Sequence, residues 1–106
     1  MQFRGGMNEL LRQAARLQRK VEETKQKLKD QEVTATAVGD KVKATVTLGR
    51  KVMRIEIDPE FLKAEGLELA LDGACAAINA AVEQADKTLE AEVTKVTNGV
   101  KIPGVI

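Results

Sequence analysis

The sequence predicts an α+β domain in the order α-β-β-β-α, with two long helices and a three-stranded antiparallel meander. Three observations support this fold class. The first thirty residues carry a heptad pattern, residues 33–57 alternate between apolar and polar side chains, and the C-terminal third has an alanine-rich helical pattern. Two long helices leave room for only one small sheet, so we expect a single domain over 1–106 that forms an arm rather than a globule.

The first helix is predicted from about Met7 to about Gln31, after a flexible lead-in over residues 1–6 that contains Gly5-Gly6. Its apolar positions alternate at spacings of three and four residues, as in helices that pack against another helix. We call this row the seam; it contains Met7, Leu10, Ala14, Leu17, Val21, Thr24, Leu28 and Gln31. Because Thr24 and Gln31 are polar, the seam should loosen or meet the sheet at its far end.

Three strands are predicted at residues 33–38, 41–48 and 51–57. Gly39-Asp40 and Gly49-Arg50 supply tight turns between them, which makes the three strands an antiparallel meander. Each strand has one polar face, so we expect the sheet to be covered on one side only.

The pair Asp58-Pro59 predicts the start of a short helical segment, because aspartate caps helices and proline fits the first helical position. Gly66 interrupts, and the last helix is predicted from about Leu67 to about Val96, before flexible residues 97–106. Gly73 costs a helix about 1 kcal/mol, which indicates a close contact or a bend. The expected core-facing stripe of this helix is Leu71, Cys75, Ile78, Val82, Ala85 and Leu89.

The composition argues against catalysis. The chain has no His, no Trp and no Tyr, and Cys75 is its single cysteine. A zinc-type metal site, a phosphate-binding glycine loop and a nucleophile with its base are therefore not expected, and we expect no catalytic residue, no cofactor and no small-molecule substrate. Cys75 should be a small buried hydrophobic residue in a reducing, cytosolic compartment. No apolar run approaches the roughly 18 residues of a membrane span and no signal-peptide pattern is present, so we expect no membrane partner.

The formal net charge is only +1, but the charges are segregated. Residues 1–30 carry eight basic and four acidic side chains, whereas residues 60–106 carry four basic and eight acidic ones. Arg12, Arg16 and Arg19 align on one side of the first helix, opposite the seam. This stripe suits bidentate contacts with phosphates, but the residues alone favour a charged helix surface that pairs with Glu83, Asp86, Glu90 and Glu92 of the last helix.

Connectivity suggests where a nucleic-acid site would lie. The two long helices join the sheet by their inner ends, so both chain termini are expected at the distal tip of the arm. Single-strand binders stack bases on aromatic side chains, and this chain has only Phe3 and Phe61, so we expect duplex DNA as the partner. The candidate DNA-binding residues are Arg4, Arg12, Arg16, Arg19, Lys20, Lys95 and Lys101, and the alternative site is the sheet cluster Lys41, Lys43, Arg50, Lys51 and Arg54.

Four segments in order resemble the YbaB/EbfC nucleoid-associated proteins over nearly the whole chain. They are the opening Phe3-Arg4-Gly5-Gly6-Met7, the block from Gly39 to Asp58-Pro59, the run Ala77-Ile78-Asn79-Ala80-Ala81, and the tail Gly99 with Pro103-Gly104. The resemblance implies a cytoplasmic, nucleoid-located homodimer shaped like tweezers. It also implies helical arms that bind double-stranded DNA and influence nucleoid organisation or gene expression.

Two other functions remain open at this stage. A helix–strands–helix chain with long arms is also the layout of a prefoldin-like holdase, and a plain protein-interaction scaffold would need its charges only for solubility. Holdases expose apolar residues at the arm tips, whereas DNA-binding arms expose basic ones. Because an alanine-rich stripe and a one-sided sheet give a thin monomer core, each of these functions is compatible with a homodimer.

Overall fold

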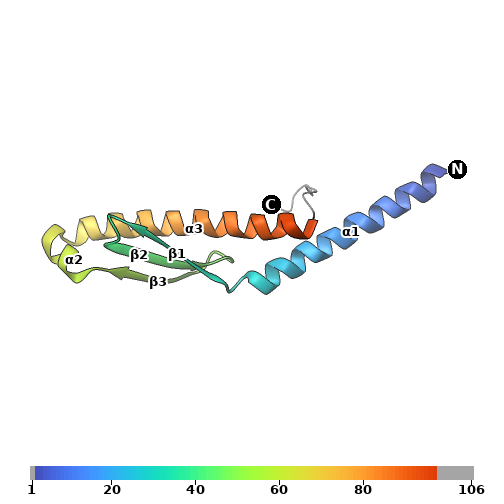
Figure 1. Cartoon of the computed structure of the whole chain (residues 1–106). Coiled ribbons are helices and arrows are strands. Elements are labelled where there is room, and N and C mark those ends of the chain that lie inside the picture. Colours follow the sequence, from blue (N-terminus) through green and yellow to red (C-terminus); the bar gives the residue numbers. More distant parts are fainter. Residues whose placement is uncertain (1, 98–106) are drawn as a thin grey trace.

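A computed structural model describes residues 2–97 of the chain, with side chains described from Gly6 onward. The molecule is an elongated rod with principal extents of 75 × 18 × 17 Å. The elements are α1 (Gln2–Leu28), β1 (Glu32–Ala37), β2 (Val42–Thr47), β3 (Val52–Ile57), α2 (Pro59–Glu65) and α3 (Leu67–Thr97). Figure 1 shows α3 lying along the sheet while α1 projects from the opposite end of the rod to α2. The α-β-β-β-α order and the arm-like shape are confirmed.

Helix α1 is longer at its start than the sequence predicts. It begins at Gln2 and includes Gly5-Gly6, so the predicted start at Met7 is wrong. Glycine weakens a helix by about 1 kcal/mol but does not end it unless the backbone also turns. At the other end, α1 closes at Leu28, whose carbonyl accepts a hydrogen bond from the Gln31 backbone N–H at 2.9 Å. The Gln31 carbonyl then accepts one from Leu48 at 2.9 Å, so the end of the seam meets the sheet.

The three strands form one antiparallel sheet in the order β1-β2-β3. β2 is central, with Val33 opposite Val46 on one side and Ile55 opposite Ala44 on the other. A bulge at Thr45/Val46 shifts the β2–β3 register. In the β2–β3 turn the left-handed residue is Arg50, with φ 68°, and not the neighbouring glycine. Gly49 serves a different purpose, since its N–H donates to the Lys29 carbonyl at 3.0 Å and leaves no room for a side chain.

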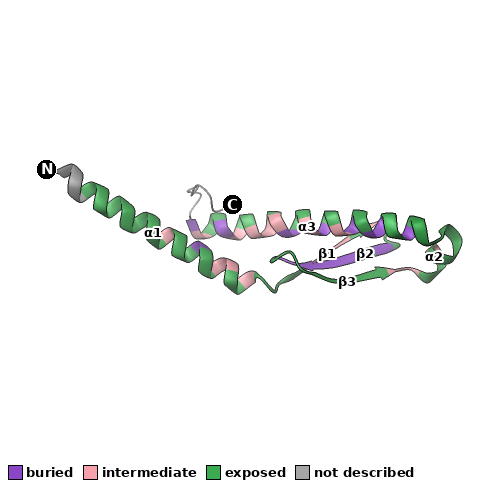
Figure 2. Ribbon diagram, turned by 180° about the vertical axis from the view of Figure 1, so that it is seen from behind, coloured by how far each residue is buried: buried purple, intermediate pink, exposed green. Residues whose placement is uncertain are grey.

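The core lies between one face of the sheet and the inner side of α3. Val42, Ala44, Val46 and Leu48 of the sheet meet a row of alanines, Ala74, Ala77, Ala81 and Ala85. Figure 2 shows this buried surface between α3 and β2, with the other side of the sheet left open. On that side the hydroxyls of Thr34 and Thr45 form a hydrogen bond of 2.9 Å, and Thr45 is itself buried, at 2% exposed. Helix α3 therefore covers one face of the sheet, as expected, but the other face is not fully exposed.

The predicted stripe on the last helix is partly wrong. Ala85 is buried, but Leu71 is 54% exposed and Cys75 is exposed in the chain, so burial of Cys75 within the monomer is contradicted. The physical reason is that alanines, not large residues, let α3 approach the sheet closely. We call the row Leu71, Cys75, Ile78 and Val82 the apolar flank of α3; Ile78 and Val82 are only partly buried against the core edge.

Gly73 makes the close approach that its position in a helix suggested. A Cβ at this position would lie 3.0 Å from the Val42 Cγ2 atom and 3.2 Å from the Val38 Cγ2 atom. Val38 itself has φ 55°, an uncommon conformation for a β-branched residue. The helix runs through Gly73 without interruption, so the glycine serves packing rather than bending.

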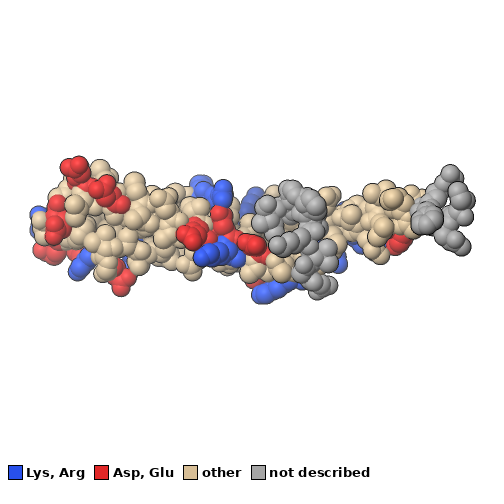
Figure 3. All heavy atoms as spheres, turned by 90° about the horizontal axis from the view of Figure 1, so that it is seen from above, with Lys and Arg blue, Asp and Glu red and all other residues tan. Residues whose placement is uncertain are grey.

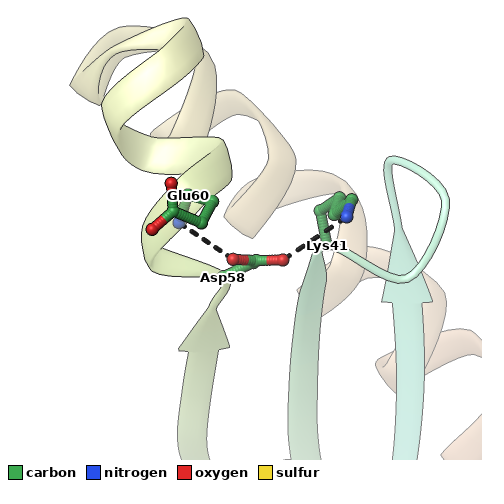
Figure 4. Close-up of polar contacts among 3 residues, drawn as sticks. All are labelled: Lys41, Asp58 and Glu60. Atoms are coloured by element: carbon green, nitrogen blue, oxygen red, sulfur yellow. Dashed lines mark hydrogen bonds and ion pairs between the residues drawn. The ribbon is translucent and has the colours of Figure 1, made fainter.

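Helix α2 follows strand β3 directly, and its N-terminus is capped. Asp58 is the N-cap: its Oδ1 atom accepts a hydrogen bond of 2.9 Å from the Glu60 N–H, and Pro59 takes the first position. Figure 4 shows Lys41 reaching the other carboxylate oxygen, with Nζ–Oδ2 at 3.4 Å. The Glu60 N–H and then Lys41 hold the pKa of Asp58 below its usual value. These contacts tie the start of α2 to the strand beside it.

Candidate nucleic-acid interface

The N-terminal half of α1 is an arm that its own chain leaves uncovered. Val21 is fully buried where α1 contacts α3, and Leu17 is partly buried. Nearer the N-terminus the seam is open, with Met7 and Leu10 at 59% and 63% exposed. Figure 1 shows α3 ending beside the middle of α1, with the remainder of α1 extending beyond it. We call residues 6–17 the free arm.

The predicted arginine stripe lies along this arm and on past it. Arg12, Arg16 and Arg19 are all exposed, and Lys20 lies next to them. Arg12 is 3.9 Å from Glu9 of the same helix, a long contact between exposed groups that neutralises little charge. Within residues 6–97, Arg16 and Arg19 form no ion pair. The stripe therefore presents its guanidinium groups to solvent.

Pairing of this stripe with the acidic side of the last helix does not occur. Asp86 binds Arg50, Glu83 lies 3.3 Å from Lys87, and Glu92 lies 3.3 Å from Lys95. These acids are thus matched with cations of the sheet or of α3 itself. Within the residues that the structure describes, Glu90 forms no ion pair either, so none of the four acids pairs with the arginine stripe.

The two long helices do not end together at one tip, and the C-terminal end of the chain lies outside the described residues. α3 covers the sheet for most of its length, so its last turn reaches only the middle of α1, where Val93 and Thr97 are buried. Lys95 lies in that last turn and is paired with Glu92, away from the free arm's end. Arg4 belongs to the first turns of α1 but its side chain is outside the described part, as is the whole of Lys101.

The alternative cluster on the sheet is largely neutralised. Lys41 pairs with Asp58 at 3.4 Å, Arg54 pairs with Glu32 at 3.3 Å, and Arg50 binds Asp86 through two hydrogen bonds. In the part of the chain that the structure describes, Lys43 and Lys51 are the members of this cluster without an ion pair. Three of the five cations of the sheet cluster are thus paired with carboxylates.

The Arg50–Asp86 contact is a feature that the sequence did not reveal. It joins the β2–β3 turn to α3 across 36 positions of the chain, with Arg50 Nε 3.0 Å from Asp86 Oδ1. The hydrogen bonds and the opposite charge raise the pKa of Arg50 and lower the pKa of Asp86. Asp86 follows Val82 by one helical turn, so this contact lies in line with the apolar flank of α3.

Figure 3 shows how unevenly charge is spread over the rod when it is viewed from above. Acidic side chains gather at the end that carries α2, while Lys and Arg lie over the middle together with further acidic side chains. None of the helices in residues 2–97 is long and apolar enough to cross a membrane. Across the same residues, His, Cys, Asp and Glu form no group that could hold a metal ion.

Comparison with known proteins agrees with the geometry. A nucleoid-associated protein of Acetivibrio thermocellus is 36% identical over 103 residues, covering 96% of this chain and 91% of that protein. A nucleoid-associated protein of Clostridium acetobutylicum is 34% identical over 100 residues, covering 94% and 89%. A crystal structure of an uncharacterized Helicobacter pylori protein shares the fold, with a TM-score of 0.63 at 15% identity over 86% of this chain and 92% of that one. Because the model of the YbaB/EbfC DNA-binding family matches residues 3–100, the chain belongs to that family.

Proposed function

We propose that this protein binds duplex DNA along α1, with little sequence selectivity, and acts as a nucleoid-associated homodimer in the cytoplasm. The observation that carries the proposal is the exposed stripe of Arg12, Arg16 and Arg19. Acidic side chains of α3 that could have paired with this stripe form ion pairs with other cations instead. Relatives named as nucleoid-associated proteins support the nucleoid location. An effect on nucleoid organisation or gene expression is part of the proposal.

Phosphate contact is the mode of binding that these side chains favour. Guanidinium groups match phosphate oxygens in pairs, and residues four and three apart on a helix form one continuous row. Such contacts position a protein on the duplex without reading its bases. We assign the main role to Arg12, Arg16, Arg19 and Lys20, and supporting roles to Arg4, Lys95 and Lys101.

The homodimer is supported by apolar surface that the chain does not cover. Strand β3 exposes Val52 and Ile55 at 45% and 41%, and the apolar flank of α3 beside it exposes Leu71 at 54%. A patch of this kind is characteristic of a protein–protein contact rather than of a solvent-facing surface. A two-fold pairing through β3 and the flank would cover it.

A charge reversal tests the DNA site directly. We expect the double variant Arg12→Glu/Arg16→Glu to weaken binding of unrelated duplexes alike, at least tenfold at moderate salt, because phosphate contacts are lost and repulsion is added. The matched control is Lys43→Glu/Lys51→Glu, which makes the same change of charge on the sheet. Fluorescence anisotropy with labelled duplexes measures both. Unchanged affinity in the first variant, with loss in the second, would place the site on the sheet.

A holdase function is the second candidate, because the free arm also exposes Met7, Leu10 and Leu11 at 59–63%. A holdase would suppress the aggregation of a heat-denatured enzyme at stoichiometric amounts. Its activity would fall when Leu10 and Leu11 become serine and would persist in the arginine reversal. The DNA-binding protein should show the opposite pattern.

A further inference from the structure

The turn between β2 and β3 is attached to the C-terminal end of α1. The backbone N–H groups of Leu48 and Gly49 donate to the carbonyls of Gln31 and Lys29 at 2.9 and 3.0 Å, in the short connection between α1 and β1. A Cβ at Gly49 would lie 3.1 Å from the Lys29 carbonyl oxygen, so the turn and the end of α1 are in close contact. The end of α1 is therefore held in place by this turn.

The same turn is attached to α3 by the Arg50 side chain. Arg50 Nε donates to Asp86 Oδ1 at 3.0 Å, and Arg50 Nη2 donates to Asp86 Oδ2. A bidentate pair of this kind fixes the relative orientation of the two side chains as well as their distance. We call Arg50 and Asp86 the clasp. Through the clasp and the hydrogen bonds of the turn, the end of α1 is connected to the middle of α3.

The backbone of Arg50 indicates that its side chain has a specific use. Arg50 has φ 68°, a left-handed conformation that few residues other than glycine, asparagine and aspartate adopt. The glycine of this turn is the preceding residue, Gly49, which the close contact with Lys29 requires. A residue held in an uncommon backbone conformation must be compensated by the surrounding structure. At Arg50 the two hydrogen bonds to Asp86 supply that compensation.

Direct contact between α1 and α3 is thin, so a second attachment matters for the direction of α1. Among residues 6–28 of α1, Val21 alone is buried, and the other residues that meet α3 are only half-buried. One buried residue holds a helix at a point but leaves its direction poorly defined. The turn supplies an attachment at the end of α1, and the clasp fixes that attachment to α3.

We propose that Arg50 and Asp86 are positioning residues that hold α1, and with it the arginine stripe, in one direction relative to α3. The consequence for DNA rests on the proposed function, whereas the consequence for the direction of α1 does not. A stripe that is already oriented loses less freedom when it contacts a duplex. The clasp therefore raises affinity for DNA without contributing a phosphate contact.

Distances between two nitroxide spin labels test the direction of α1 without DNA. The labels are attached at Gln13→Cys on the free arm and Ala91→Cys on α3, both exposed positions, in a Cys75→Ser background. An excess of unlabelled chain limits the signal to distances within one chain. Asp86→Asn should widen the distribution of distances markedly. Arg50→Gly should do the same, because glycine keeps the conformation of the turn and removes only the side chain.

Glu83→Gln is the matched control, because it removes a carboxylate from the same helix and the partner Lys87 also belongs to that helix. This variant should keep the narrow distribution of the parent. The exchange Arg50→Asp/Asp86→Arg should restore it, since aspartate tolerates the left-handed conformation. Circular dichroism should show parent-like helical content in every variant, because the clasp side chains are 64% and 41% exposed. A parent-like distribution in Asp86→Asn and Arg50→Gly would overturn the inference, as would equal widening in Glu83→Gln or no recovery in the exchange.

DNA titration tests whether the clasp positions the arginine stripe. Asp86→Asn removes a negative charge, so charge alone predicts equal or tighter binding of a duplex, whereas loss of the clasp predicts binding that is several-fold weaker. The slope of log K against log salt should stay that of the parent, because no phosphate contact is lost. An affinity equal to that of Glu83→Gln would overturn the positioning role. A parent protein that binds no duplex would refute the proposed function alone, since the label distances test the clasp independently.

Discussion

At the scale of single residues, small side chains control how closely this fold packs. Gly73 and the alanine row bring α3 onto the sheet, and Gly49 brings the β2–β3 turn onto the end of α1. In each case the missing or short side chain faces backbone or a branched residue that cannot rotate away. The molecule is therefore most sensitive at positions that look least informative in the sequence.

Gly73→Ala should destabilise the protein by about 1–3 kcal/mol, although alanine favours helices. The new Cβ would meet Val42 and Val38 at 3.0 and 3.2 Å, which outweighs a gain in helix propensity of about 1 kcal/mol. Gly6→Ala is the matched control, because it also lies in a helix and has nothing within 4 Å of its added Cβ. Urea denaturation should show opposite shifts for the two variants, and a shift toward stability in both would contradict the packing role of Gly73.

Asp58 should contribute a pH-dependent part of the stability. Its pKa is lowered in the folded protein by the Glu60 N–H and by Lys41, so the folded state binds the proton more weakly than the unfolded chain does. The stabilisation is complete above the unfolded pKa of about 4 and is lost as the pH falls through the lower folded value. Asp58→Asn keeps a capping oxygen but should flatten this acid limb of a plot of Tm against pH. An identical acid limb in both proteins would contradict the assignment.

At the scale of elements, the strands were predicted to within a residue or two, because alternation and turn residues are local signals. The start of α1 and the buried face of α3 were not, for physical reasons. Two adjacent glycines end a helix only where the backbone also turns. A row of large residues marks the buried face of a helix only where no row of small residues can pack more closely. Leu71 and Cys75 therefore ended up exposed, while the alanines beside them were buried.

The candidate site was predictable in part for the same reasons. Alignment of Arg12, Arg16 and Arg19 follows from helix geometry alone. Which acids would neutralise which cations depends on tertiary contacts, such as Arg50 with Asp86, that no local pattern encodes. The position of Lys95 was predicted wrongly because a heptad pattern indicates that a helix packs against another helix, but not how far that other helix extends.

Cys75 can report whether the apolar flank of α3 is an interface. The thiol is exposed in the single chain, so dilute protein should react quickly with a thiol reagent. If the flank and β3 form the homodimer contact, the rate of labelling should fall several-fold as the protein concentration rises. Ile55→Lys, which changes an exposed residue of β3, should abolish this concentration dependence. A rate that is independent of concentration in the parent protein would exclude Cys75 from the interface.

At the scale of the whole molecule, the chain has a net charge of only +1, and acidic side chains gather at the end of the rod that carries α2. The acids near α2 would repel a duplex that lay along the entire rod. The arginine stripe instead begins on the part of α1 that extends past α3, so a duplex bound there, as proposed, would stay away from those acids. Affinity should consequently be modest and strongly dependent on salt.

The salt dependence gives a number for this arrangement. If a dimer contacts about six phosphates, the plot of log K against log salt should have a slope of about −5. Removing Arg12 and Arg16 from both copies should reduce the magnitude of that slope markedly, since each lost phosphate contact accounts for about 0.9. Titrations at a series of salt concentrations provide the measurement. A slope near zero would mean that the duplex is held by something other than phosphate contacts.

Because α1 contacts α3 near Val21, the N-terminal part of α1 can tilt about this contact. From Val21 to Gln2 the helix spans about 28 Å, and only the shorter segment on the other side is held against α3 and the sheet. Tilting it by about 10° at this fulcrum would carry its first turn through about 5 Å, more than the rise of about 3.4 Å between successive phosphates of a strand. A small change in the packing of Val21 is thus enough to align the rigid row of guanidinium groups with the phosphates of a bent or a straight duplex.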